Sequence, residues 1–136
     1  MEEIWKDIKK YEGIYQISNL GRVKSLSRQK KHSYNGVALL KEKILKPQKA
    51  NGYYFVRLCK DSISKQYLVH RLVASHFLNN PNNYNEINHI DEDKTNNNAI
   101  NLEWCTHKYN INYGTGNVRR KLTELNTKRG EHYVFG

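Results

Sequence analysis

The sequence has 136 residues and a mass of 16.1 kDa, which indicates one domain or a domain with a short extension. Its 23 basic and 13 acidic residues give a net charge of +10, which favours a polyanionic partner. Only 38% of the residues are hydrophobic, and no apolar run approaches the roughly 18 residues of a membrane span. The start lacks the pattern of a signal peptide, so we expect a cytoplasmic protein with no membrane partner. Cys59 and Cys105 stand far apart, so neither a disulfide framework nor a cysteine zinc site is indicated.

The charge is distributed unevenly along the chain. Residues 22–49 hold nine basic side chains and one acidic one, and residues 108–129 hold six against one. Between them, residues 86–103 hold five acidic side chains and only Lys94. Basic segments bind phosphates, whereas an acidic segment between them would repel the same polymer unless a divalent cation lies between its oxygens and the phosphate. The alternative is that the acidic segment is only a solvated surface.

The first half of the chain predicts antiparallel strands. Residues 14–18 and 22–26 flank Asn19-Leu20-Gly21, which is typical of a hairpin turn. The basic residues 27–43 predict a loop or a ribbon ordered by its ligand. Residues 52–60 alternate, with Tyr54, Val56 and Leu58 on one face and Tyr53, Phe55 and Arg57 on the other. If exposed, the second face would suit a nucleic-acid backbone, whereas half-buried core aromatics are the commoner arrangement. A turn over 61–65 and a short strand over 66–69 should follow.

The second half predicts a mixed arrangement of helices and strands. Residues 68–78 have an apolar stripe at helical spacing, ending before Pro81. Residues 86–90 and 102–106 predict short strands around a loop rich in Asn and Asp. Thr106 is placed to cap a helix over 107–113, which Gly114 would end. A further helix is expected around 119–125.

Residues 87–110 resemble the ββα-metal core of HNH nucleases, and the pattern is most similar to the phage-encoded HNH homing endonucleases. The resemblance rests on Ile87-Asn88-His89 at the first strand, Asn101-Leu102 at the second and Asn110 on the helix. Residues 69–77 are similar to the helix that precedes this core. Residues 4–23, with Ser18-Asn-Leu-Gly-Arg-Val23, resemble the N-terminal nuclease-associated DNA-binding motif of the same family.

The resemblance implies a role for each matched residue. His89 would be the general base that takes a proton from the attacking water, which suits an imidazole because its usual pKa lies near 6.5. Asn88 and Asn110 would be metal ligands, and their oxygens fit Mg²⁺, with Mn²⁺ as the alternative. Asn101 would hold the loop through backbone hydrogen bonds and orient His89. The expected products are a 5′ phosphate and a 3′ hydroxyl.

Three points at this site remain open. His107 lies one helical turn before Asn110 and is an alternative helix ligand. Asn at both 88 and 110 leaves the ligands uncharged, so the attraction for a cation would come from the DNA phosphate or from Asp91 or Asp93. Many relatives have Gly where this chain has Glu92, so we expect a different turn there.

The basic residues of the N-terminal region are candidates for contacts with the DNA backbone. Phosphate contacts position a protein without specifying a sequence, so these residues predict affinity and no target. The candidates are Arg22, Lys24, Arg28, Lys30, Lys31, Lys49 and Arg57.

The sequence therefore predicts an α+β protein, with an N-terminal antiparallel β-rich DNA-binding region over 1–66, an HNH ββα-metal core over 67–113 and a basic tail over 114–136. The predicted function is metal-dependent hydrolysis of double-stranded DNA, as a nick or a double-strand break, by a monomer. The alternatives are a DNA-binding protein with a degenerate core and an RNA-binding protein. The sequence does not separate a homing role from a packaging or restriction role.

Overall fold

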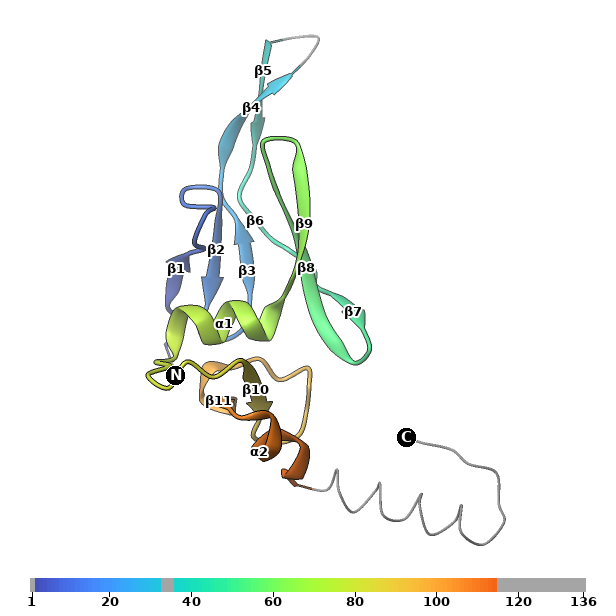
Figure 1. Cartoon of the computed structure of the whole chain (residues 1–136). Coiled ribbons are helices and arrows are strands. Elements are labelled where there is room, and N and C mark those ends of the chain that lie inside the picture. Colours follow the sequence, from blue (N-terminus) through green and yellow to red (C-terminus); the bar gives the residue numbers. More distant parts are fainter. Residues whose placement is uncertain (1, 33–35, 115–136) are drawn as a thin grey trace, which may run out of the picture.

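The computed structural model describes residues 2–32 and 36–114, with side chains placed for all but residues 30–32 of these. The tail from residue 115, including the helix predicted around 119–125, lies outside this part of the chain. The strands form four separate antiparallel sheets, and α1 lies across the middle of the molecule between the N-terminal sheets and the C-terminal hairpin (Figure 1). No helix among the described residues is long and apolar enough to cross a membrane.

The first sheet contains the predicted N-terminal hairpin. It has the order β1 (Trp5–Asp7), β2 (Tyr15–Ser18), β3 (Val23–Ser25) and β6 (Lys43–Ile44). β2 and β3 pair with Ile17 opposite Val23, and both residues are buried, because alternate side chains of a strand face the core. The hairpin prediction is confirmed.

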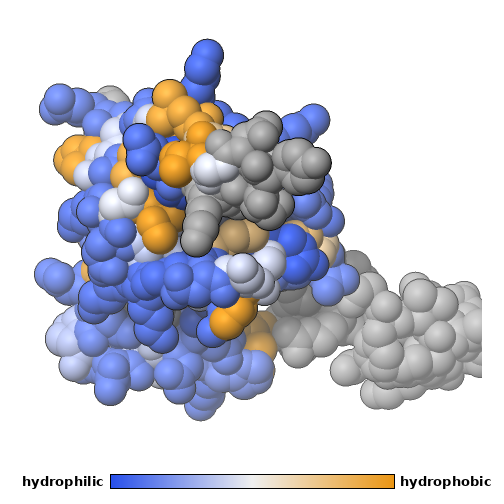
Figure 2. Space-filling view, turned by 90° about the horizontal axis from the view of Figure 1, so that it is seen from above, coloured by the Kyte–Doolittle hydropathy of each residue, from blue (hydrophilic) through white to orange (hydrophobic). Residues whose placement is uncertain are grey.

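The basic stretch after β3 forms a ribbon. β4 (Arg28–His32) and β5 (Gly36–Leu40) pair antiparallel and extend away from the first sheet (Figure 1). Of the two alternatives predicted here, the structure shows the ribbon. Val37 and Leu39 on β5 are exposed. Figure 2, which looks onto the ribbon end, shows hydrophobic patches within a largely hydrophilic surface.

The third sheet consists of β7 (Gln48–Ala50), β8 (Tyr53–Lys60) and β9 (Ile63–Leu68). β9 is longer than the predicted strand, because the turn takes only Asp61 and Ser62, both at positive φ, as in tight two-residue hairpin turns. For the face that carries Phe55, the sequence left two alternatives, an exposed surface or core aromatics, and the structure shows burial of Phe55. Phe55 is 8% exposed and pairs with Leu68, so both faces of β8 are partly covered.

α1 (Val69–Phe77) buries its apolar stripe against the strands, as its spacing predicted. Val69 belongs to this helix rather than to the strand predicted over 66–69. His76 bonds locally and across the structure: its Nδ1 lies 2.7 Å from the Leu72 carbonyl oxygen, and its Nε2 accepts from Lys9 N. The helix is thereby fixed to the segment after β1.

The C-terminal part is a hairpin followed by a helix. β10 (Glu86–His89) pairs with β11 (Leu102–Cys105), with Asn88 opposite Glu103 and His89 opposite Leu102. A single-turn helix, η1 (Ala99–Asn101), precedes β11, and α2 (His107–Asn112) follows it. Thr106 Oγ1 accepts a hydrogen bond from Tyr109 N at 3.1 Å, so the predicted cap is confirmed.

One hydrophobic cluster joins the N-terminal sheets to this hairpin. It contains Ile8, Ile17 and Leu58 from the first half of the chain and Ile87 and Leu102 from the second, with α1 between them. Residue 66, where the sequence suggested a domain boundary, lies inside β9. The arrangement is compatible with the predicted α+β class.

Candidate active site

His89 lies at the end of β10 with its imidazole buried, only 6% exposed. Its ring packs near the rings of His70 on α1 and Tyr53 on β8, at centroid distances of 5.1 and 6.0 Å. Neighbouring residues of a strand face opposite sides, so His89 and Asn88 begin on different faces of β10. The hydrogen bonds and ring contacts of the described His89 side chain go to Asn97, His70 and Tyr53 rather than to Asn88 or Asn110, and the convergence of His89, Asn88 and Asn110 on one cation stays a prediction.

His70 provides an uncharged neighbour for this ring. Burial, followed by the proximity of His89 and Arg71, lowers the pKa of His70 from 6.5 to about 4. His70 Nδ1 is buried and has no hydrogen-bond partner among the described residues. The His70 ring packs against the rings of Tyr53 and His89, each at a centroid distance of 5.1 Å.

Asn97 is the hydrogen-bond partner of His89, and the sequence did not indicate it. Its Oδ1 lies 3.0 Å from His89 Nε2, and Asn97 is 5% exposed. Asn97 stands within Asn96-Asn97-Asn98, and such a run has no periodicity that distinguishes one amide from the next. Only the loop conformation selects the middle residue.

Asn101 holds the loop between β10 and β11, as the resemblance implied. Its Oδ1 accepts from Asp91 N at 2.9 Å, and its Nδ2 donates to Asp91 Oδ1 and to the Asn96 carbonyl, both at 2.9 Å. It contacts the backbone beside His89 without touching the imidazole. Its proposed orienting effect on His89 would therefore be indirect.

Asp91 and Asp93 brace the same loop. Hydrogen bonds from Asn96, from the backbone of Asp93 and from Asn101 lower the pKa of Asp91. Hydrogen bonds from the hydroxyl and backbone N–H of Thr95 lower the pKa of Asp93. These bonds engage the two carboxylates that the sequence offered as sources of negative charge for a cation.

Glu92 keeps the backbone conformation that glycine would favour. Glu92 has φ of 64°, so the argument that a residue other than glycine would avoid positive φ here does not hold, and whether the turn differs from that of the relatives stays a prediction. Its carboxylate occupies the space in which a Cβ on Gly114 would lie. The end of α2 is thereby close to the loop, and Tyr113 also donates from its hydroxyl to the Ile90 carbonyl oxygen at 2.7 Å.

Glu86 links the first strand to α2 and is a second residue that the sequence analysis missed. Its Oε1 accepts from Asn110 Nδ2 at 3.0 Å, and its Oε2 lies 2.5 Å from His107 Nδ1. The hydrogen bond from Asn110 and the interactions with His107 lower the pKa of Glu86. Glu86 and Asn88 share one face of β10, so a carboxylate lies on the face that carries both matched amides. This i, i+2 spacing was visible in the sequence.

The amides fit an oxygen-preferring cation in one respect. Asn88 is 5% exposed, and its Nδ2 is buried with no partner among the described residues. A buried unpaired N–H donor costs about 1–3 kcal/mol and calls for an acceptor such as a water or phosphate oxygen, so this atom does not itself indicate a cation. Asn110 uses its Nδ2 for Glu86, which leaves its oxygen as an acceptor. No group of three His, Cys, Asp or Glu side chains that could hold a metal ion occurs in the described residues.

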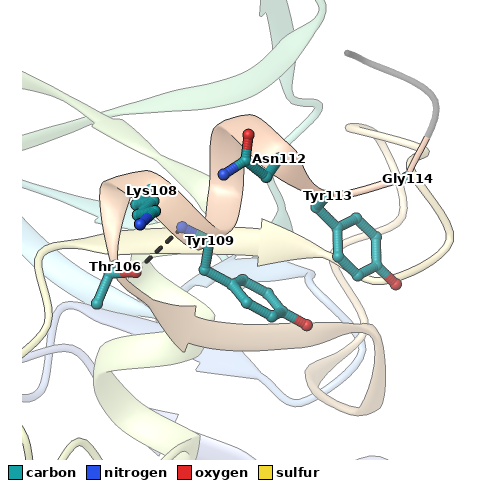
Figure 3. Close-up of a pocket in the computed structure, with 6 residues that line it drawn as sticks. All are labelled: Thr106, Lys108, Tyr109, Asn112, Tyr113 and Gly114. Carbon is teal, nitrogen blue, oxygen red and sulfur yellow. Dashed lines mark hydrogen bonds between the residues drawn. The ribbon is translucent and has the colours of Figure 1, made fainter. Parts of the chain in front are cut away.

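The outer side of α2 carries a shallow hollow (Figure 3). The rings of Tyr109 and Tyr113 lie there with their centroids 5.6 Å apart. None of the matched nuclease residues lines this hollow. Its lining residues are Thr106, Lys108, Tyr109, Asn112, Tyr113 and Gly114.

Three of the predicted DNA contacts have partners within the protein. Arg22 forms an ion pair with Glu3, and the ammonium of Lys24 lies 4.1 Å from the centroid of the Trp5 ring. Arg28 donates to Ser25 Oγ and the Leu26 carbonyl oxygen, both at 3.1 Å. Arg28 therefore stabilises the β3–β4 connection, whatever else it contacts.

The other candidates lie on the strands and the ribbon. Lys49 on β7 and Arg57 on β8 are exposed. Lys30 and Lys31 lie on β4, in the part of the ribbon where side chains are not described. The DNA contacts of all these residues stay predictions.

Comparisons with known proteins support the resemblance. The NUMOD4 motif matches residues 3–59. DNA endonuclease I-HmuI of Bacillus phage SP01 is 40% identical over 120 residues, which cover 85% of this chain and 62% of that protein. The uncharacterized HNH endonuclease L245 of Acanthamoeba polyphaga mimivirus is 39% identical over 118 residues, covering 87% of this chain and 32% of that protein.

The fold of this chain is also similar to that of a solved HNH homing endonuclease. The structure described as "DNA binding and cleavage by the HNH homing endonuclease I-HmuI" matches with a TM-score of 0.63 and 37% identity, covering 98% of this chain and 62% of that chain. Over most of its length the chain is therefore similar to HNH endonucleases, among them a phage homing enzyme, and residues 3–59 match the NUMOD4 motif. The chain spans less than two thirds of the length of these relatives.

Proposed function

We propose that this chain is a metal-dependent DNA endonuclease that hydrolyses a phosphodiester bond to a 5′ phosphate and a 3′ hydroxyl. The observation that carries the proposal is the buried His89, held by Asn97 at the end of β10, within a chain whose relatives are named DNA endonucleases. Double-stranded DNA is the proposed substrate, and the net charge of +10 would supply attraction for it.

His89 is the proposed general base. Its imidazole takes one proton from a water molecule while the water oxygen forms a bond to phosphorus. The bond between phosphorus and the 3′ oxygen breaks, and the 3′ oxygen takes up a proton from solvent. Asn101 keeps the loop in place through its bonds to Asp91 and Asn96.

Asn88 and Asn110 are the proposed ligands of one divalent cation, with Mg²⁺ favoured over Mn²⁺ and with His107 as the alternative on α2. When bound, the cation would stabilise the charge that develops on the leaving oxygen. Glu86 adds negative charge beside Asn110 and so offsets the lack of charge on the two amides. Glu86 is thus a further source of negative charge, beside the DNA phosphate and Asp91 or Asp93.

Cleavage of supercoiled plasmid with Mg²⁺ tests the function. We expect wild-type protein to nick the plasmid, EDTA to abolish nicking and His89→Ala to lower the rate by about 10²–10⁴-fold, because a positioned general base contributes that much. One nuclease core per chain favours a single-strand nick by a monomer. Circular dichroism and DNA binding of the variant serve as controls for folding. Undiminished cleavage by folded His89→Ala would remove the catalytic role.

A DNA-binding protein with an inactive core is the second candidate, and the uncharged pair Asn88 and Asn110 favours it. In that case the protein would bind duplex DNA equally well with and without Mg²⁺ and would leave the plasmid intact.

A further inference from the structure

The N-terminal hairpin turn touches the loop that holds His89. Ala99 N donates to the Asn19 carbonyl oxygen at 2.8 Å. A Cβ built on Gly21 would lie 2.9 Å from Asn97 Cβ and 3.0 Å from the Asn97 carbonyl oxygen, so no larger residue fits without movement. Gly21 also has φ of 87°, which L side chains disfavour. The turn is therefore in direct van der Waals contact with Asn97.

Hydrogen bonds fix the turn itself. The Ser18 hydroxyl is buried and accepts from Leu20 N and Arg22 N, both at 3.2 Å. The Asn19 side chain accepts from Ile4 N at 2.8 Å and donates to the Glu2 carbonyl oxygen at 3.1 Å. Asn97 therefore rests against a rigid surface rather than against a flexible loop.

The bond between Asn97 and His89 selects one form of the imidazole. An amide oxygen can only accept a hydrogen bond, so the nitrogen that faces it, His89 Nε2, must carry the proton. A neutral imidazole has one N–H, which leaves a lone pair on Nδ1. Both side chains are more than nine-tenths buried, so solvent competes poorly for this bond. Among the described residues, this is the hydrogen bond of the His89 imidazole, while the His89 carbonyl oxygen accepts from Glu92 N at 2.9 Å.

We propose that Asn97 is a positioning residue that holds His89 in the Nε2–H form, with Nδ1 as the atom that accepts the proton from water, and that the Asn19–Gly21 turn holds Asn97. The inference rests on the proposed function, in which His89 is the general base. It gives the Ser18–Gly21 part of the N-terminal motif a role inside the nuclease core, in addition to any contact with DNA.

Nuclear magnetic resonance of the His89 imidazole, in protein without metal or DNA, tests the bond directly. With ¹⁵N-labelled histidine at a pH where the ring is neutral, we expect wild-type protein and Asn97→Asp to show the proton on Nε2, because both retain an oxygen acceptor. Asn97→Leu should show a mixture of the two forms. A wild-type ring protonated on Nδ1, or an unchanged spectrum in Asn97→Leu, would overturn the proposal.

Cleavage kinetics provide the second measurement. Asn97→Leu should lower kcat at least about tenfold, a part of what a general base contributes, with the Kd for duplex DNA changed less than about twofold. Asn97→Asp should recover most of kcat. Asn98→Ala is the matched control: its side chain accepts from Ile100 N in the same loop and does not touch His89, so kcat should stay within about twofold. Equal losses in Asn97→Leu and Asn98→Ala would indicate general loosening of the loop and contradict the proposal.

The two measurements separate failure of the inference from failure of the function. Wild-type protein that shows the Nε2–H form but never cleaves DNA contradicts the proposed function and leaves the hydrogen bond standing. Wild-type protein that cleaves DNA, with Asn97→Leu as active as wild type, contradicts only the role of Asn97.

Discussion

The N-terminal sheets and residues 86–113, the predicted nuclease core, are stabilised by different interactions. The region of residues 2–68 buries large apolar side chains, among them Ile8, Ile17 and Leu58, against α1. Within residues 86–113, the buried apolar side chains are only Ile87, Leu102 and Cys105, and the loop is held by a network of amides and carboxylates. Apolar burial depends on area, whereas a hydrogen bond depends on the position of single atoms. Substitutions should therefore affect overall stability in the first region and local geometry in the second.

The largest effect on stability is expected at the centre of the N-terminal region. Leu58 is fully buried, so Leu58→Ala should lower the free energy of unfolding by about 3 kcal/mol through lost contacts and a cavity. Ile63 on the same hairpin is 59% exposed, and Ile63→Ala should change the free energy by less than about 0.5 kcal/mol. Urea unfolding measures both, and similar values for the two variants would contradict the assignment of the core.

A smaller and more local effect is expected in the loop of the nuclease core. Asn101→Ala removes the hydrogen bonds to Asp91 and Asn96, which should cost about 2–3 kcal/mol in the stability of the loop. Amide hydrogen exchange should increase at Asp91 and stay slow in β2 and β3. Ile100→Ala is the control, since Ile100 is 70% exposed beside Asn101. Uniform acceleration across the chain would contradict the difference between the regions.

The contact between the two regions should depend on pH through His70. Its folded pKa, about 4, lies below the ordinary 6.5, so its contribution is fully present above pH 6.5 and is lost as pH falls towards 4. Between pH 7 and pH 5 this one group should cost about 2 kcal/mol of stability, because protonation favours the unfolded chain. His70→Phe keeps an aromatic ring beside Tyr53 and His89 and removes the titration. Urea unfolding at both pH values should show a smaller loss in the variant; an equal loss would exclude His70 as its source.

The smallest predicted difference isolates the contact of the hairpin turn with Asn97. Gly13 and Gly21 both have positive φ, but a Cβ on Gly13 would meet no atom within 4 Å. Gly13→Ala should therefore lower the free energy of unfolding by about 1 kcal/mol, which is the conformational penalty of a positive φ. Gly21→Ala should lower it by about 1 kcal/mol more, because the added Cβ displaces the loop at Asn97. Thermal unfolding compares the two variants. Equal decreases in the free energy of unfolding would mean that the turn is not in close contact with Asn97.

Local sequence preferences were enough to predict much of the secondary structure. Gly21 in a turn, Thr106 as a cap and the apolar stripe of α1 each express a preference of a few adjacent residues, and each was found where predicted. The exposure of Phe55 and the backbone conformation of Glu92 were not fixed by adjacent residues. The burial of Phe55 depends on partners brought by other strands, and the positive φ of Glu92 is held by a loop bonded at several other residues.

The sequence by itself determined the main hairpin, the longer strands and the two helices, the excess of positive charge and the residues that match an HNH nuclease, because these depend on residue type and on spacing along the chain. Only the tertiary structure decided that Asn97 bonds His89, that Glu86 joins Asn110 and that Gly21 supports the loop. The contact of Gly21 with Asn97 joins residues more than 70 positions apart, and the bonds of His89 and Glu86 depend on how the chain turns between the partners. The geometry of these three contacts comes from tertiary packing, and no preference of adjacent residues encodes it.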